Sequence, residues 1–193
     1  MQAFRVKPGQ RVLNTPGLGS MGFGLPAASG ACIASGRRTV TIVGDGGLQH
    51  NIQALETIRR LDLPLKVFVL NNAGYGSIRI MQKKHFNSNY VCCDAASGMS
   101  IPDVRRTAAA YGLKTFRIGG RKTLLSGVRK ALALEGPVVC EVMVEPWLET
   151  APRIASYVNS DGSIESKPLE DLWPFLDREE LEANMNVKPG AVP

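Results

Sequence analysis

The sequence predicts an α/β protein built on a three-layer parallel sheet with helices on both faces. Three observations predict it. Short apolar segments alternate with longer segments whose apolar residues recur at helical spacing. The short segments are mostly apolar, which is typical of parallel strands buried on both faces. Two of them, 39–43 and 65–70, lead directly into Gly44-Asp45-Gly46 and Asn71-Asn72. Parallel sheets bind ligands at such carboxyl ends of strands.

The individual elements follow from local signals. The helix after the first strand is indicated by Leu48, Ile52 and Leu55, three or four positions apart. Pro102 suits the first turn of a later helix, and Gly112 suits its stop. Residues 84–100 are polar and aperiodic and predict a long loop. We expect strands at 39–43, 65–70, 114–118 and 138–144, and helices at 21–35, 48–60, 77–84, 102–111 and 123–134.

The chain divides in composition near Pro146. Residues 1–146 carry the alternating pattern and are expected to form one domain. Residues 147–193 are expected to form an irregular acidic C-terminal tail, with a terminal helix over 177–184 and an apolar anchor at 172–176. Residues 1–144 hold 19 Lys/Arg against 7 Asp/Glu, whereas residues 145–193 hold 4 against 10.

Charge and hydropathy exclude several classes of protein. The net charge of +6 could suggest a nucleic-acid partner. However, the basic pairs, such as Arg59-Arg60, lie near expected helix ends, where cations are locally favourable. No segment approaches the roughly 20 apolar residues that span a bilayer, and residues 1–5 lack the apolar core of a signal peptide. We therefore expect a cytoplasmic protein with neither a nucleic-acid nor a membrane partner.

A glycine motif, Gly17-Leu18-Gly19-Ser20-Met21-Gly22, matches the G-x-G-x-x-G of dinucleotide-binding domains, and Asp45 follows at about the distance of a ribose-binding acid. An NAD-binding Rossmann domain is thus one alternative. It is weakened because Pro16 interrupts the segment where a strand should precede the motif, and because Asp45 stands between two glycines.

The strand-end residues suit a different ligand. The Asp45 carboxylate and the Asn72 amide offer hard oxygen ligands, and the neighbouring glycines expose the backbone. This combination fits a cation that holds a phosphate group. Taken singly, Asp45 would be a turn or N-cap aspartate and Asn71-Asn72 a turn pair.

The two motifs together resemble the signature of thiamine diphosphate-dependent enzymes. The segment from Gly17 to Ala28 is similar to the corresponding stretch of acetolactate synthase and its relatives. The likeness covers roughly residues 12–146, which correspond to the C-terminal diphosphate-binding domain of that family. The tail segments 167–171 and 174–176 are similar to the ends of acetolactate synthase-like proteins.

The resemblance implies a set of cofactor and metal ligands. Asp45, the Asn72 side chain and the main-chain carbonyl of Gly74 would bind Mg²⁺, and diphosphate oxygens and a water would complete the octahedron. Backbone N–H groups of Gly46 and Gly47 would face the diphosphate at the start of a helix. The further glycines that would let the backbone approach the cofactor are Gly44, Gly74 and Gly76.

The resemblance also implies residues around the thiamine rings. Met21 would support the bent cofactor from below, and the Gly19 carbonyl and the Met21 amide would bind the pyrimidine edge. His50 could shuttle protons near the thiazolium, although an ordinary surface or core histidine has the same sequence. Tyr75 could cap the site or simply pack. Arg79 could attract an acidic substrate, or be an exposed helix charge.

One essential group of the family is not recognisable here: the glutamate that activates the pyrimidine belongs to a separate pyrimidine-binding domain. Glu56 is not a candidate for it. The segment before Gly17 is also short for a full diphosphate-binding domain. We therefore expect half of an active site, completed by a pyrimidine-binding domain or subunit in a homo- or hetero-oligomer. The implied reaction is decarboxylation of a 2-oxo acid, with release of an aldehyde or addition to a second carbonyl. The alternative is a non-catalytic cofactor-binding or assembly subunit.

Overall fold

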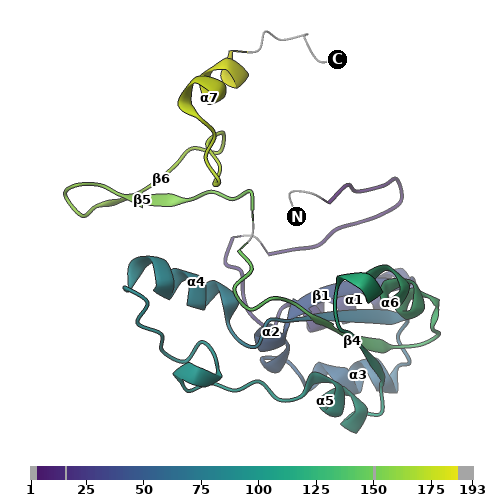
Figure 1. The fold of residues 1–193 in the computed structure, drawn as a ribbon. Helices are drawn as coiled ribbons and strands as arrows, with labels where there is room; N and C mark the ends of the chain where they lie inside the picture. The colour runs from purple at the N-terminus through teal and green to yellow at the C-terminus, as the bar shows by residue number, and fades with distance from the viewer. Residues whose placement is uncertain (1–3, 16, 150, 187–193) are drawn as a thin grey trace. The chain divides into compact units, whose positions relative to one another are not determined.

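The computed structural model describes residues 4–15, 17–149 and 151–186. The chain divides into two compact units, residues 1–147 and 148–193 (Figure 1). The first unit holds the larger sheet and helices α1 to α6. The second unit holds a hairpin and helix α7.

The sheet of the first unit has four strands in the order β1-β2-β4-β3. Their bounds are Thr39–Gly44 for β1, Leu65–Asn71 for β2, Lys114–Ile118 for β3 and Val138–Met143 for β4. Every pair is parallel. The predicted α/β class with a parallel sheet is confirmed, because each expected strand forms close to its expected bounds.

One face of the sheet carries the larger core. The helices over it are α1 (Gly24–Ser35), α2 (Asp45–Gln49), α3 (Ala54–Arg60) and α5 (Val104–Ala110). Their apolar side chains meet those of β2 and β4, and the central members are Leu25, Leu48, Leu55, Ile58, Val67, Val69, Val104 and Val139. Burial of this apolar surface is the main stabilising term for the unit.

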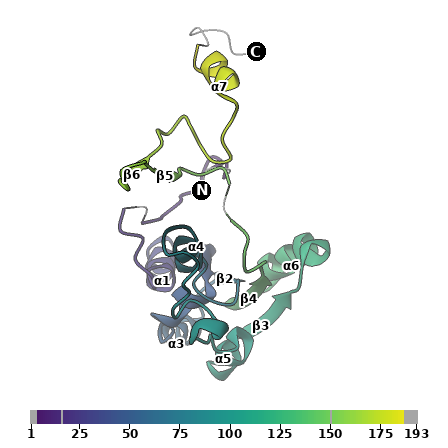
Figure 2. The same cartoon turned by 60° about the vertical axis from the view of Figure 1, so that its left-hand side comes forward.

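The opposite face is covered by helix α6 (Arg121–Ala133), which lies across the sheet from α1 and α3 (Figure 2). Its Ala131 and Val128 pack on Phe68, Ile118 and Cys140. The cover does not extend to the β1 edge, where Val40 is 49%, Ile42 66% and Leu70 40% exposed. Helices therefore lie on both faces, as predicted, but the second layer is incomplete among the described residues.

The exposed apolar edge gives a first prediction. Ile42→Lys is expected to reduce self-association of the isolated chain, because exposed apolar edge strands favour pairing between molecules. Its free energy of unfolding should change by no more than about 1 kcal/mol, since the side chain is already 66% exposed. Light scattering and urea denaturation check both values.

Thr41→Lys is the matched control for Ile42→Lys. The Thr41 side chain lies on the buried face of the same strand, and its hydroxyl donates to the Gly24 carbonyl. A lysine there should destabilise the fold. Equal stability of the two variants would contradict the assignment of the two faces.

Two helix predictions need correction. The helix expected at 21–35 begins only at Gly24, because Gly22 adopts a left-handed backbone with φ of 84°. The helix expected at 48–60 is two helices, α2 and α3. The break falls at Asn51, whose side chain donates to the Gly22 carbonyl and is itself an acceptor for Gln53. Such side-chain bonds compete with a continuous helix.

Three later helices also have shifted bounds. Helix α4 spans Gly76–His85 and α6 starts at Arg121. Helix α5 starts at Val104 rather than at Pro102, because the Asp103 carboxylate accepts from the Arg106 N–H and caps the helix. The predicted loop after α4 contains one short 3₁₀ turn, Ala95–Ser97, capped by Asp94.

The second unit is more regular than an irregular tail. An antiparallel hairpin joins β5 (Ser156–Val158) and β6 (Ile164–Ser166). Its turn contains Asn159, Asp161 and Gly162, which are turn-forming residues that could have signalled it. The predicted terminal helix is α7, Arg178–Met185, capped by Asp177.

In the expected apolar anchor, the Arg153 guanidinium lies over the Trp173 ring, whereas Phe175 and Leu176 remain exposed. None of the helices that the structure describes is long and apolar enough to cross a bilayer.

Candidate functional site

The two chemical motifs meet at the carboxyl ends of two neighbouring strands of the sheet. Strands β1 and β2 are neighbours, and Gly44 stands in register with Leu70. Asp45 follows β1 directly as the first residue of α2, and Asn71 is the last residue of β2. The parallel register therefore delivers Asp45 and Asn72 to adjacent strand ends.

The Asp45 carboxylate is buried and held by backbone groups. Its side chain is 1% exposed. Oδ1 accepts from the Gly46 N–H at 2.9 Å, and Oδ2 accepts from the Gly74 N–H at 3.0 Å. Burial raises the pKa of Asp45, and the N–H donors of Gly46 and Gly74 oppose that rise. A nearby cation would relieve the cost of burying this charge.

The Asn72 side chain closes the group around Asp45. Its NH₂ group donates to the Gly74 carbonyl oxygen at 2.8 Å and to Asp45 Oδ1 at 3.3 Å. If the amide were turned over, its oxygen would take the same place. Three acceptors so close, with no proton between them, would then repel one another unless a cation lay between them. The cluster can thus be satisfied by the amide protons or by a cation.

The loop that carries Gly74 has backbone φ angles that few residue types adopt. Ala73 has φ of 59° and Gly74 has φ of 143°. A Cβ on Gly74 would overlap the Cys93 carbonyl oxygen, which accepts from the Tyr75 N–H at 2.8 Å. The segment 90–98 therefore packs, through Cys93, against the loop of Ala73 and Gly74 and restricts the direction of the Gly74 peptide.

The other predicted glycines fall into two groups. A Cβ on Gly46 would overlap the Tyr75 ring, and one on Gly76 would overlap the Asn72 amide, so both positions need the small residue. Gly44 and Gly47 have no neighbouring atom within 4 Å of an added Cβ. The Tyr75 ring thus packs over Gly46 at the start of α2.

The residues predicted around the thiamine rings lie beside the second helix. Gly19 has φ of 59° and Met21 is 44% exposed, both in the turns before α1. His50 is exposed at the end of α2. A Cβ on the buried Gly22 would lie 2.8 Å from His50 Cβ, so the Met21 turn touches the His50 segment. The structure brings these two segments together.

Sequence reasoning missed several residues that shape the site. Arg79 was considered as an exposed helix charge or a substrate-attracting group, but it is 2% exposed. Its Nη2 donates to the Asn72 carbonyl at 3.0 Å, and its Nη1 lies 3.6 Å from Asp94 Oδ2. A buried arginine thus connects α4 with Asn72 and with Asp94. Asn51, which fixes Gly22, and the Cys93 carbonyl carry no local sequence signal, because their contacts are made across the fold.

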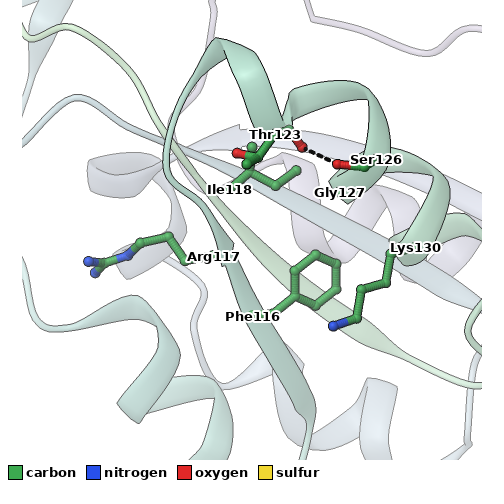
Figure 3. Close-up of a pocket in the computed structure, with 7 residues that line it drawn as sticks. All are labelled: Phe116, Arg117, Ile118, Thr123, Ser126, Gly127 and Lys130. Carbon is green, nitrogen blue, oxygen red and sulfur yellow. Dashed lines mark hydrogen bonds between the residues drawn. The ribbon is translucent and has the colours of Figure 1, made fainter.

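A separate pocket lies at the opposite edge of the sheet. It measures about 220 Å³ and lies between β3 and α6 (Figure 3). The Thr123 hydroxyl donates to the carbonyl of Gly120, which precedes α6, and the Ser126 hydroxyl donates to the Thr123 carbonyl. The Arg117 side chain points away from the pocket. The pocket has no connection with Asp45 or Asn72.

Comparison with known proteins assigns the chain to a family. Residues 1–142 match the family model described as the thiamine pyrophosphate enzyme, C-terminal TPP binding domain. The chain belongs to this family. It is a TPP-binding domain similar to those of acetolactate synthases, and the recognition made from the sequence is confirmed. The described residues before Gly17 form no strand, so the G-x-G-x-x-G segment is not in a Rossmann arrangement.

Individual relatives of this TPP-binding domain are of two kinds. An acetolactate synthase of Arthrospira platensis is 36% identical over 154 residues, covering 79% of the chain and 26% of the relative. The acetolactate synthase large subunit of Cyanidium caldarium is 34% identical, covering 80% and 26%. A solved structure, the thiamine diphosphate-dependent 4-hydroxybenzoylformate decarboxylase of Rhodococcus jostii RHA1, superposes with a TM-score of 0.56 at 30% identity. It matches over 65% of this chain and 23% of its own. The domain thus spans about a quarter of the length of these relatives.

Proposed function

We propose that this TPP-binding domain holds thiamine diphosphate through Mg²⁺ and supplies half of the active site of an acetolactate synthase-like 2-oxo acid decarboxylase and carboligase. The Mg²⁺ ligands are the Asp45 carboxylate, the Asn72 side-chain oxygen and the Gly74 carbonyl. The observation that carries this proposal is the convergence of the Asp45 carboxylate, the Asn72 side-chain amide and the Gly74 carbonyl at the ends of β1 and β2.

The spacing of these groups is compatible with an octahedral ion. Mg²⁺ binds oxygen at 2.0–2.1 Å, so neighbouring ligands of an octahedron lie about 2.9 Å apart. The Asn72 amide group that faces the cluster lies 2.8 Å from the Gly74 oxygen and 3.3 Å from Asp45 Oδ1, so its oxygen would have this spacing after the amide turned. The protein offers a single carboxylate to the ion, and a diphosphate would supply the remaining negative charge.

Without the ion, the Asn72 amide has a second stable orientation. Its NH₂ group then donates to the Gly74 and Asp45 oxygens. Binding of Mg²⁺ would select the orientation with oxygen inward, because an NH₂ group cannot ligate a cation. On this proposal, only the Asn72 amide would have to turn when the ion binds.

The remaining predicted residues fit a cofactor around this anchor. Gly46 and Gly47 lie in the first turn of α2, although the Gly46 N–H is already used by Asp45. The Gly47 N–H and the side of Gly76 would face the diphosphate. Gly19, Met21 and His50 would lie along the rings, with Met21 as the support and His50 as a proton carrier. When bound, thiamine diphosphate supplies the electron sink for decarboxylation and carbon–carbon bond formation.

A second polypeptide or domain would complete the site. In the relatives, a segment of this length is about a quarter of the protein. Glu56 is paired with Arg59 on the surface of α3, at 2.6 Å, and does not serve as the activating glutamate. We infer that a pyrimidine-binding domain supplies that glutamate in an oligomeric cytoplasmic enzyme.

Removal of the metal tests the anchor. We expect isothermal titration calorimetry to detect thiamine diphosphate binding with Mg²⁺, and to find affinity at least about tenfold weaker with EDTA. NAD, titrated in parallel, should not bind. Equal affinity with and without Mg²⁺ would contradict the metal assignment, and binding of NAD would favour a Rossmann function. Adding a pyrimidine-binding domain and assaying pyruvate decarboxylation separates an enzyme half from a non-catalytic subunit.

The pH dependence of binding follows from Asp45. The ion needs the charged carboxylate, and the pKa of Asp45 is raised by burial. Affinity for Mg²⁺ and thiamine diphosphate should therefore fall as the pH drops through this raised pKa, by about tenfold for each unit below it. The ligand-free chain should show the opposite trend from this group, losing stability as the pH rises from the unfolded-state pKa to the folded-state value. Calorimetry and urea denaturation at several pH values measure the two trends, and affinity that stays constant down to pH about 4 would contradict the first.

A further inference from the structure

A buried carboxylate, Glu141, lies in the middle of β4 and is 1% exposed. Its two oxygens have different partners. Oε2 accepts from Arg117 Nε at 2.7 Å, and Arg105 Nε lies 3.4 Å from the same oxygen. Oε1 accepts from Asn71 Nδ2 at 2.7 Å. Two arginines thus hold one side of the carboxylate, and its other side faces the end of β2.

The Asn71 side chain carries this contact to the metal loop. Its Nδ2 donates to Glu141, and its Oδ1 accepts from the Ala73 N–H at 3.0 Å. Ala73 has the left-handed φ of 59°, which an alanine adopts only when its surroundings enforce it. The next residue, Gly74, donates its N–H to Asp45. Two hydrogen bonds therefore link Glu141 to the Ala73 amide, and the backbone links Ala73 to Gly74, which binds Asp45.

The charge of Glu141 determines the direction of its bond to Asn71 and, through the Asn71 amide, of the bond to Ala73. A carboxylate can only accept, so Asn71 must present its NH₂ group to Glu141 and its oxygen to the Ala73 N–H. A neutral amide at position 141 would have one oxygen and one NH₂. Because the arginines can only donate, the oxygen would face them and the NH₂ would meet Asn71. Asn71 would then have to turn over, and its NH₂ would face the Ala73 N–H.

We propose that Glu141 is a positioning residue for the loop of residues 72–74: through Asn71 it holds Ala73 in the backbone conformation that keeps the Asn72 side chain and the Gly74 peptide beside Asp45. The inference rests on the proposed Mg²⁺ site for its purpose, but the loop conformation can be measured in the ligand-free chain. The partners of Glu141 described above, Asn71, Arg105 and Arg117, are not among the proposed metal ligands.

The test compares Glu141→Gln with Arg117→Gln. Both remove one charge from the same buried cluster, but only the first reverses the bond to Asn71. The measured quantity is the amide hydrogen exchange rate of Ala73 in the ligand-free chain, divided by that of Val69 as an internal reference. Compared with the unaltered chain, this ratio is expected to rise at least about tenfold in Glu141→Gln and to stay unchanged in Arg117→Gln. Affinity for Mg²⁺ and thiamine diphosphate should fall 10- to 100-fold in the first variant alone, as for other outer-shell partners of metal ligands.

The outcomes separate this inference from the proposed function. If the unaltered chain fails to bind thiamine diphosphate with Mg²⁺, the proposed function is wrong, and the exchange of Ala73 still decides the role of Glu141. Equal exchange in Glu141→Gln and the unaltered chain, or equal acceleration in both variants, would overturn the positioning role. Should Glu141→Gln not fold, Asn71→Ala removes the same link while leaving the arginine pairs in place, and it must show the same faster exchange of Ala73.

Discussion

Gly74→Ala is expected to abolish Mg²⁺-dependent binding of thiamine diphosphate, with a loss of affinity of about 100-fold or more. An added Cβ would overlap the Cys93 carbonyl oxygen, which is backbone and cannot rotate away. The φ of 143° at this position is also strained for alanine. The loop must therefore move, and its movement displaces the Gly74 carbonyl, a proposed metal ligand. The cost to folding should be about 1–3 kcal/mol. Titration calorimetry and urea denaturation measure the two effects.

Gly30→Ala provides the matched control for this change. Gly30 lies inside α1, and an added Cβ would meet no atom within 4 Å. The substitution should leave binding unchanged and stabilise the helix by up to about 1 kcal/mol. Retained affinity in Gly74→Ala would show that the Gly74 carbonyl is not a ligand.

Asp45→Ala is the second change with a large expected effect. It removes the single carboxylate of the proposed ion site and leaves the N–H groups of Gly46 and Gly74 without their acceptor. Loss of a buried acceptor costs about 1–3 kcal/mol per orphaned group. Affinity for thiamine diphosphate in the presence of Mg²⁺ should fall by more than the 10- to 100-fold typical of outer-shell changes.

Asp103→Ala separates stability from binding in this experiment. Asp103 caps α5 through the Arg106 N–H, and its removal should cost about 0.5–2 kcal/mol. It lies outside the proposed ligand set, so affinity should stay at the value of the unaltered chain. An Asp45→Ala chain that binds as well as Asp103→Ala would rule out Asp45 as a ligand.

The sheet and its ligand-bearing edge could be predicted from the sequence because their signals are local. The apolar runs before Asp45 and Asn71 are short and continuous, and both form parallel strands. Once the strands are parallel neighbours, their ends must meet. The starts of α5 and α7 are likewise signalled by single N-cap residues, Asp103 and Asp177.

The parts that could not be predicted depend on contacts between distant residues. The break between α2 and α3 follows from the bond between Asn51 and Gly22, which are 29 positions apart. Glu141 reads as a polar residue in a strand, and its partners Asn71, Arg105 and Arg117 are identifiable only in the folded chain. For the same reason, Arg79 reads as an exposed charge although it is buried.

The burial of Arg79 links the proposed ion site to a chromophore. Its guanidinium donates to the Asn72 carbonyl and also lies over the Trp147 ring, with Cζ 5.1 Å from the ring centroid. Tyr90 packs edge-on against the same ring at 5.6 Å. A shift of the Asn72 backbone on ion binding would move the cation above the indole. Trp147 fluorescence should therefore provide an intrinsic optical signal for loading of the site, and a Trp173→Phe chain would remove the other tryptophan emission.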